Sequence, residues 1–427
     1  MMDALLFGLF ALLMFAGVPL AVAMGLAGVA VVAVADLGML SLPTNVYTGI
    51  AKYPLMAIPV FVIAGLIFER AGVAATIVRF ASALVGQRRG SLAIVAILVA
   101  MILGGISGSG PADSAAVGAV MLPSMLKAGY PRAFTAGVIA AAGSTDILIP
   151  PSIAFVIYSL LVPQASVPAL FAAGMIPGIL SGLTLVLVAW WLSVRHGFEA
   201  NVADERPPFW QSLKDAGWGL LAPVIILGGM RSGLFTPTEA AVVAVFYGVV
   251  VGVLIYRSLG WRDIVEVLVE SAEISSVILT VVALASVFAW ASNTLGTFDH
   301  LAAALLGTGL SEIPMLLSIQ LLLLIAGMFL DAISIYFIFL PLLVPIAQHF
   351  GWDLVWFGVI ITMNMALGQF HPPLGVNLMV TCRMAGVSME STVPWVLWMI
   401  AAMAGTMFLV TFIPDLALWL PRHLGYL

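Results

Sequence analysis

Residues 104–118 read Gly-Gly-Ile-Ser-Gly-Ser-Gly-Pro-Ala-Asp-Ser-Ala-Ala-Val-Gly, and they interrupt an apolar stretch that runs from residue 90 to residue 126. A single helix over that stretch would be much longer than the about 20 residues that cross a bilayer. It would also carry Gly108, Gly110 and Pro111 in its middle, where they break helical hydrogen bonding. We therefore expect a re-entrant hairpin, which enters the membrane, turns at the Gly-rich segment and returns to the same side.

The composition of the whole chain agrees with a location in lipid. Of the 427 residues, 63% are hydrophobic and only 8% are charged, with 15 Lys and Arg and 20 Asp and Glu. So few charges cannot cover the surface of a large soluble enzyme, and so much apolar sequence excludes a disordered chain. The net charge of −5 gives no sign of nucleic-acid binding, and the single cysteine excludes a disulfide framework.

Long apolar stretches follow one another along the chain. The segment between Asp146 and Arg195 contains no charged residue and is long enough for two membrane passes. Because these stretches far exceed the about 10-residue strands of a membrane barrel, we predict an all-α polytopic membrane protein. The N-terminal stretch 4–35 has no basic region before it, so we interpret it as membrane helix, broken around 17–19. Near Thr236 the order Thr-Pro-Thr-Glu predicts a helix start with a capping box.

Basic residues give the orientation. Alternation of the predicted passes places twelve of the 15 Lys and Arg residues on one side, which the positive-inside rule assigns to the cytoplasm. Both ends of the 90–126 hairpin lie on that side. A second long apolar stretch, 312–348, is interrupted at Gly327 and Asp331 and has no Lys or Arg at its flanks. We therefore expect this second hairpin to open to the outside.

The two halves of the chain repeat one design in opposite orientations. Asp113 precedes Pro123 by ten residues, and Asp331 precedes Pro341 by ten. After each hairpin follows a helix that a proline pair breaks. Paired broken segments in two inverted halves are typical of the binding site of a secondary transporter. The predicted organisation is a first inverted repeat at 1–194 (hairpin 90–126, broken helix 133–162), a polar cytoplasmic linker at 195–215 and a second repeat at 216–427 (hairpin 312–348, broken helix 354–387).

The polar residues at the four interruptions are candidates for a binding site. Proline pairs leave backbone carbonyls free one turn earlier, and carbonyl and hydroxyl oxygens bind alkali cations, while helix starts at the same breaks favour anions. The candidate oxygens are those of Ser107, Ser109, Asp113, Ser144, Thr145, Asp146, Asp331, Ser334, Gln369 and Asn377; His371 lies nearby without an assigned role. Helix capping and close helix packing are the alternative explanation for the serines and for Asp113.

Several of these motifs resemble one family. The stretch 105–118, the pattern Pro123-x8-Arg132, the stretches 143–152 and 235–241, and Pro372-Pro-x-Gly-x-Asn377 are similar, in this order, to the large membrane subunit of TRAP (tripartite ATP-independent periplasmic) transporters. The resemblance covers nearly the whole chain. It implies a multi-pass protein of the bacterial inner membrane that imports small carboxylates, such as dicarboxylates and other organic acids, with sodium by an elevator mechanism. It also implies a separate small four-helix membrane subunit and a soluble periplasmic substrate-binding protein as partners.

The resemblance also assigns roles to the candidate residues. The implied ligands of Na+ are Ser107, Ser109, Gly143, Ser144, Thr145, Pro150, Gly327, Asp331, Gly368 and Pro372. The expected contacts to the substrate are Asp113, Asp146, Gln369 and Asn377. Segments 54–90 and 274–310 are expected to include arm helices that hold a mobile part against a scaffold.

Two other functions fit parts of the pattern. A stand-alone sodium and carboxylate carrier of similar architecture would transport without any binding protein. An intramembrane aspartyl enzyme would use Asp113 and Asp331 as its catalytic pair. The second alternative requires two facing aspartates on regular helices, and the proline breaks and inverted hairpins argue against it. We therefore expect a transporter subunit and no enzymatic activity.

Overall fold

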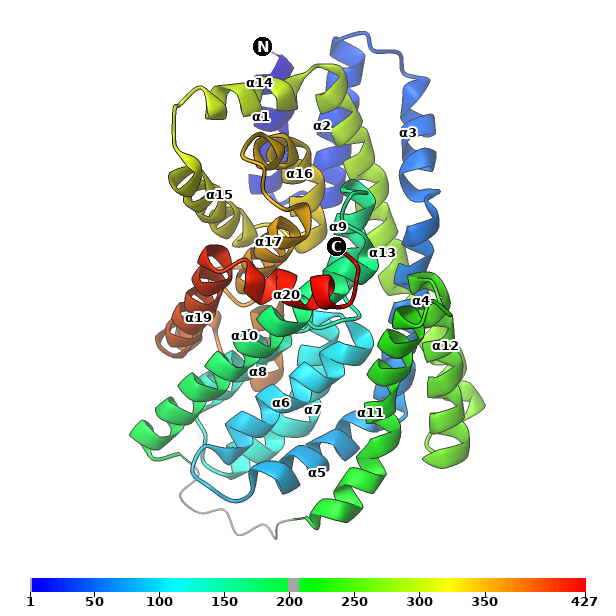
Figure 1. Cartoon of the computed structure of the whole chain (residues 1–427), viewed down its shortest axis with the longest axis vertical. Coiled ribbons are helices and arrows are strands. Elements are labelled where there is room, and N and C mark those ends of the chain that lie inside the picture. Colours follow the sequence, from blue (N-terminus) through cyan, green and yellow to red (C-terminus); the bar gives the residue numbers. More distant parts are fainter. Residues whose placement is uncertain (1, 199–206) are drawn as a thin grey trace.

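The chain folds almost entirely into helices. A computed structural model describes residues 2–198 and 207–427, and these residues form twenty α-helices and no strand (Figure 1). The prediction of an all-α protein is therefore confirmed. An apolar chain in lipid has no water with which to pair its backbone groups, and helices pair them internally. Seven of the described helices are long and apolar enough to cross a membrane.

The first half contains α1 (Met2–Phe15), α2 (Leu20–Val34), α3 (Ser41–Ile50), a 3-10 turn (Tyr53–Met56), α4 (Ala57–Arg70), α5 (Val73–Val85), α6 (Ser91–Ser107), α7 (Gly110–Lys127), α8 (Arg132–Gly143), α9 (Ile153–Leu161) and α10 (Val167–His196). The second half contains α11 (Phe209–Arg231), α12 (Pro237–Val250), a π-helical turn (Val251–Ile255), α13 (Trp261–Thr294), α14 (Thr297–Leu306), α15 (Glu312–Gly327), α16 (Ala332–His349), α17 (Leu354–Gly368), α18 (Val376–Ala385), α19 (Met389–Phe412) and α20 (Asp415–His423).

The predicted interruptions are real helix breaks. α6 ends and α7 begins around the first tip (residues 108–111), and α15 gives way to α16 around the second tip (residues 327–331). The break at Gly108 has a steric reason. Its φ is +63°, and a methyl group in place of its hydrogen would lie 2.1 Å from the carbonyl oxygen of Pro151. Only glycine meets both conditions without strain.

The two helices that follow the tips are also broken where the proline pairs predict. The first break (residues 144–152) separates α8 from α9, and the second break (residues 369–375) separates α17 from α18. The bonds Pro150–Pro151 and Pro372–Pro373 are both cis. The N-terminal stretch is likewise divided, because α1 ends at Phe15 and α2 begins at Leu20.

The helices form two packed sets that each draw on both halves of the sequence. In the first set α13 packs on α2, α3 and α4, while α12 packs on α4 and α11. The second set places α8 against α6, α7, α18 and α19, and it places α17 against α10 and α15. α10 and α19 lie side by side at its edge (Figure 1). We call these the α13 set and the α8 set. α9 packs on α10 and α17 of the α8 set, whereas α16 packs on α13 as well as on α9 and α17 and so lies between the sets.

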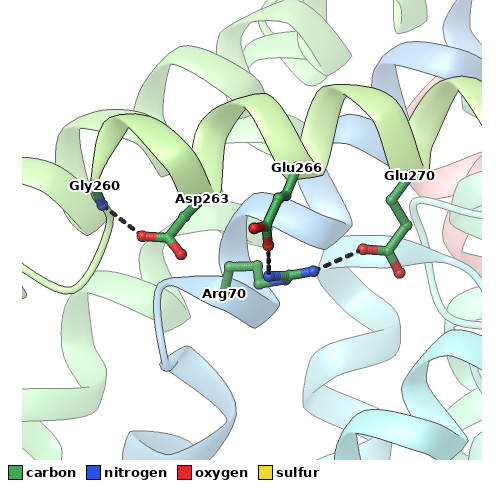
Figure 2. A network of polar contacts seen from close by, with 5 residues as sticks. All are labelled: Arg70, Gly260, Asp263, Glu266 and Glu270. Atoms are coloured by element: carbon green, nitrogen blue, oxygen red, sulfur yellow. Dashed lines mark hydrogen bonds and ion pairs between the residues drawn. The ribbon is translucent and has the colours of Figure 1, made fainter.

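An ion-pair network joins two helices of the α13 set. Arg70, at the end of α4, donates to Glu266 at 2.8 Å and to Glu270 at 3.1 Å, both on α13 (Figure 2). Asp263 caps the start of α13 by accepting from the backbone N–H of Gly260 (Figure 2). α13 therefore begins well before the apolar stretch and carries an acidic first half.

The remaining boundaries refine the sequence prediction. The capping box is confirmed, since the hydroxyl of Thr236 accepts from the N–H of Glu239 and the Glu239 carboxylate accepts from the N–H of Thr236.

The linker is narrower than the predicted 195–215, because α10 continues to His196 and α11 already starts at Phe209. Part of that predicted linker, residues 199–206, lies outside the described residues.

Candidate functional site

One cavity lies where the tips and breaks come together. Its volume is about 430 Å³, within the range of small-molecule sites. The first tip lines one part of its wall with residues 108–111, and residues 327–333 of the second tip and α16 line another. Gly368 and Gln369 contribute from the end of α17. Segments more than 200 residues apart in sequence thus share one site.

The first tip packs directly on the second break. A methyl group at Gly110 would lie 2.3 Å from Oε1 of Gln369 and 3.0 Å from Nδ2 of Asn377, so the tip approaches only because residue 110 has no side chain. Nδ2 of Asn377 donates to Oε1 of Gln369 at 3.2 Å and to the carbonyl of Ala140 at 3.3 Å. Gln369 and Asn377, both predicted as substrate contacts, are therefore neighbours that join α8, the first tip and the second break.

A group of oxygens gathers between the first tip and the end of α8. A methyl group at Gly143 would lie 2.0 Å from the hydroxyl of Ser114 and 2.9 Å from the carbonyl oxygen of Gly110. The Ser114 hydroxyl and Oδ1 of Asn377 are buried without a hydrogen-bond partner in the described residues. The carbonyl of Gly143 accepts only a long bond, 3.4 Å, from the N–H of Asp146. We call Gly110, Ser114, Gly143 and Asn377 the first oxygen group.

A second group lies between the second tip and the end of α17. A methyl group at Gly368 would lie 2.7 Å from the carbonyl oxygen of Gly327, so these two predicted residues are in contact. The carbonyl of Gly368 accepts a long bond, again 3.4 Å, from the N–H of His371. Oδ1 of Asn364, one turn earlier on α17, is buried without a partner in the described part of the chain. Gly327, Asn364 and Gly368 form the second oxygen group.

Asp113 and Asp146 form a separate buried pair. They are 4% and 0% exposed, and their carboxyl groups lie beside each other. The hydroxyl of Ser107 donates to Asp113. Close packing fixes Asp146, because a methyl group at Gly104 would lie 2.7 Å from the Cα of Asp146. Neither aspartate lines the 430 Å³ cavity, and their contact with a substrate stays a prediction.

Several predicted sodium ligands have local hydrogen bonds of their own. The hydroxyl of Ser144 donates to the carbonyl of Ala141 at 2.6 Å, and that of Thr145 donates to the carbonyl of Ala142 at 2.8 Å. Asp331 is the N-cap of α16 and accepts from the N–H of Ser334 at 2.7 Å. Ser109 and Asp331 both line the cavity.

The proline breaks free fewer carbonyls than expected. The hydroxyl of Ser152 donates to the Ile147 carbonyl at 2.5 Å, which is the carbonyl that Pro151 leaves without its helical partner. The Gln369 carbonyl, which Pro373 leaves open, accepts from the N–H of Asn377 at 2.9 Å. α8 and α17 end at Gly143 and Gly368, before Pro150 and Pro372 in the sequence, and the carbonyls of both glycines accept long hydrogen bonds of 3.4 Å.

Two residues at this site were missed by the sequence reasoning. Ser114 directly follows Asp113, and Asn364 is the one amide in the apolar run of α17. Ser114 lies one helical turn after Gly110, and Asn364 lies one helical turn before Gly368. A polar residue that close to a predicted break is the signal that could have identified both.

Buried polar groups at opposed helix breaks inside an apolar bundle define a polytopic membrane transporter. Residues 7–416 match the family model described as tripartite ATP-independent periplasmic transporter, DctM component. The chain is 38% identical over 389 residues to the C4-dicarboxylate TRAP transporter large permease protein DctM of Pseudomonas aeruginosa, with 90% of each chain covered. The corresponding protein of Rhodobacter capsulatus is 35% identical, with 99% of each chain covered. The chain belongs to the DctM family of TRAP transporter large permeases.

Two further comparisons bear on length and fold. The isethionate TRAP transporter permease protein DctMQ of Oleidesulfovibrio alaskensis is 37% identical over 97% of this chain, which spans 65% of that longer relative. A solved structure, that of the Alcanivorax borkumensis YdaH transporter, superposes with a TM-score of 0.55 at 15% identity and covers 88% of this chain and 89% of that one. The relatives are transporter permeases, so the alternative of an intramembrane aspartyl enzyme is rejected. Asp113 also pairs with Asp146 and not with Asp331.

Proposed function

We propose that this chain imports a small organic acid across the bacterial inner membrane and that the sodium gradient drives the import. The observation that carries the proposal is the meeting of both tips and both breaks at one cavity, in a chain of the TRAP large-permease family. Non-helical backbone at membrane depth persists only where protein buries it or where it lines a cavity. Such backbone supplies the carbonyl oxygens and helix starts that ions and acids need.

The two oxygen groups support the assignment of sodium as the coupling ion. Sodium prefers hard, uncharged or singly charged oxygen ligands. These groups offer glycine carbonyls beside buried side-chain oxygens that have no hydrogen-bond partner among residues 2–198 and 207–427. The first group would hold one ion with Gly110, Ser114, Gly143 and Asn377, and the second would hold another with Gly327, Asn364 and Gly368. An ion bound there supplies positive charge close to the cavity. Ser107, Ser144, Thr145 and Asp331 keep their local hydrogen bonds in this arrangement.

The proposed architecture is two inverted repeats, 1–194 and 216–427, that each contribute a re-entrant hairpin. Its support is the recurrence of the same local features. Gly143 and Gly368 are the last residues of α8 and α17. The carbonyl of each accepts a 3.4 Å hydrogen bond from the N–H of the third residue after it, and a cis proline pair follows each glycine. In an elevator mechanism the α8 set would move with the bound ion and acid, while the α13 set would remain as the scaffold.

The proposed partners are a small four-helix membrane subunit and a soluble periplasmic binding protein that delivers the acid. Family membership supports them. Relatives are named for several cargoes: C4-dicarboxylate in Pseudomonas aeruginosa, 2,3-diketo-L-gulonate in Escherichia coli and sialic acid in Haemophilus influenzae. Each of these three cargoes is a small acid with at least one carboxylate, and we propose the same class of cargo for this chain.

The test is uptake into proteoliposomes that contain this chain with both partners and an inward sodium gradient. Replacing sodium by potassium is expected to reduce uptake to background. Equal uptake in both salts would contradict the coupling to sodium. Leaving out the binding protein separates the two transporter hypotheses, because a stand-alone carrier would keep its rate.

A further inference from the structure

The side chains around the 430 Å³ cavity offer little to a doubly charged anion. We propose that the cargo of this permease carries a single carboxylate on an apolar body. This inference rests on the proposed function, because it takes the cavity between the tips as the cargo site. It narrows the class of organic acid that the site accepts.

Among the described residues that line the cavity, none is Lys, Arg or His, and the polar side chains are those of Ser109, Asp331 and Gln369. Asp331 is itself acidic. A carboxylate that loses its water shell costs several kcal/mol unless it is paired with opposite charge or donors. A second carboxylate on the cargo would find no side-chain cation and would meet Asp331.

One part of the wall does suit one carboxylate. α7 begins at Gly110 without a side-chain cap, next to Ser109, and both residues line the cavity. An uncapped helix start favours an anion. Gln369 packs against Gly110, and its Oε1 accepts from Asn377, which leaves its Nε2 as a hydrogen-bond donor. The Ser109 hydroxyl, the start of α7 and the Gln369 amide therefore lie together.

Two of the other helix starts around the cavity have side-chain caps, and the third, that of α18, has none but has one N–H bonded to a carbonyl. Asp331 caps α16 through the N–H of Ser334, and Ser152 caps α9 through the N–H of Phe155. At the start of α18 the N–H of Asn377 donates to the Gln369 carbonyl. A second carboxylate would thus find only the start of α18, where the Asn377 N–H is already bonded and where no serine hydroxyl lies at the N-cap.

Apolar side chains form most of the remaining wall. They come from both helix sets and include Leu20, Ile278, Phe329, Ile333, Met365 and Met379. A hydrocarbon body gains free energy by leaving water for such a wall, whereas a charged group loses it. The named cargoes of the relatives include both dicarboxylates and acids with one anionic group, so family membership does not decide between the two classes.

A matched pair of probes tests the inference. Hexanoate and adipate share a six-carbon chain and differ only in the second carboxylate. The full chain is purified in detergent, and its thermal unfolding is followed by tryptophan fluorescence at constant sodium and ionic strength while each probe is titrated. We expect hexanoate to raise the melting temperature at concentrations at least roughly 100-fold lower than adipate, a ratio that an unpaired carboxylate accounts for. Equal or stronger stabilisation by adipate, or stabilisation by neither probe, overturns the inference.

A pair of variants links the preference to the cavity wall. Met379 lines the cavity and is 49% exposed, so a longer polar side chain fits there without entering a packed core. Met379→Lys adds a cation. We expect the concentrations of adipate and of hexanoate that raise the melting temperature to lie within about tenfold of each other in this variant. Met379→Gln, similar in length and uncharged, is expected to keep the original ratio. A Met379→Lys ratio equal to that of the unmodified chain counts against the proposed site.

The ionic conditions separate this inference from the proposed function. If hexanoate stabilises equally when potassium replaces sodium, coupling to sodium fails while the single-carboxylate preference stands. If adipate stabilises the chain more than hexanoate in sodium and does not stabilise it in potassium, the ion-coupled function stands and the single-carboxylate inference fails.

Discussion

Ser114 and Ser144 show how differently two buried hydroxyls can be used. Both are fully buried near Gly143 at the end of α8: Ser144 follows this glycine in the sequence, and Ser114 packs on it from α7. Ser144 donates to its own helix, as serines in apolar helices often do, whereas Ser114 has no partner in the described residues. The sequence favours Ser144 as a ligand because this residue lies at the predicted break. Only the packing of α7 on α8 reveals that Ser114 is the free oxygen.

Ser114→Ala tests the first oxygen group. Removing one oxygen ligand is expected to raise the sodium concentration for half-maximal uptake by roughly tenfold. The ion loses a contact whose free energy is about that of a hydrogen bond to a charged group. The measurement is uptake as a function of sodium concentration. Ser181→Ala is the matched control, since the Ser181 hydroxyl is also buried and has no partner in the described part of the chain, but lies on α10, away from the tips. An unchanged sodium dependence in Ser114→Ala would remove this residue from the proposed ligands.

Gly108→Ala tests the geometry of the first tip. The substitution forces a side chain into a left-handed backbone conformation and against the carbonyl of Pro151. We expect it to lower the free energy of unfolding by about 2 kcal/mol or more, seen as a lower melting temperature. Gly129→Ala isolates the backbone contribution, because Gly129 has φ +88° and no atom near its missing Cβ. It is expected to cost about 1 kcal/mol, and a Gly108→Ala effect no larger than this would contradict the steric role.

At the scale of elements, the sequence predicts the breaks well and their meeting poorly. Glycine and proline act on their own backbone, so residues 108–111 and the two proline pairs locate the ends of α6, α8 and α17 to within a few residues. The contact between Gly110 and Gln369 depends on how whole helices pack, and no local pattern encodes it. For the same reason no local pattern predicts that Asp113 and Asp146 lie buried side by side and outside the lining of the 430 Å³ cavity.

The Arg70 network gives a prediction about two elements. Arg70 joins α4 to α13, but its side chain is 38% exposed and those of Glu266 and Glu270 are 62% and 43% exposed. Ion pairs this accessible contribute at most about 1 kcal/mol, and salt screens them. Arg70→Gln is therefore expected to lower the free energy of unfolding by less than about 1 kcal/mol, with a smaller effect in 0.5 M salt. A loss of several kcal/mol, independent of salt, would show that the network carries the α4–α13 contact.

For the molecule as a whole, the division into two helix sets matters more than the division into two halves. Each half supplies helices to both sets, so the chain crosses repeatedly between the α13 set and the α8 set. An elevator requires the contact between the sets to change during transport, while contacts within a set persist. Ile278 of α13 and Ile153 of α9 line one small cavity of about 40 Å³ between the sets, beside Ser109.

A cross-link at this position tests the relative motion. In a Cys382→Ser background, Ile153→Cys and Ile278→Cys provide two thiols that a short bifunctional reagent can join. Joining them is expected to abolish uptake, and reduction of a cleavable linker is expected to restore it, because the α8 set can then move again past the α13 set. The control pair is Ala71→Cys and Ser258→Cys, whose positions are neighbours within the α13 set, since the Ser258 hydroxyl donates to the Ala71 carbonyl at 2.9 Å. This control should keep its uptake when cross-linked. Full uptake by the linked Ile153 and Ile278 variant would mean that the cargo crosses without relative movement of these two helix sets, and the elevator would have to be abandoned for this chain.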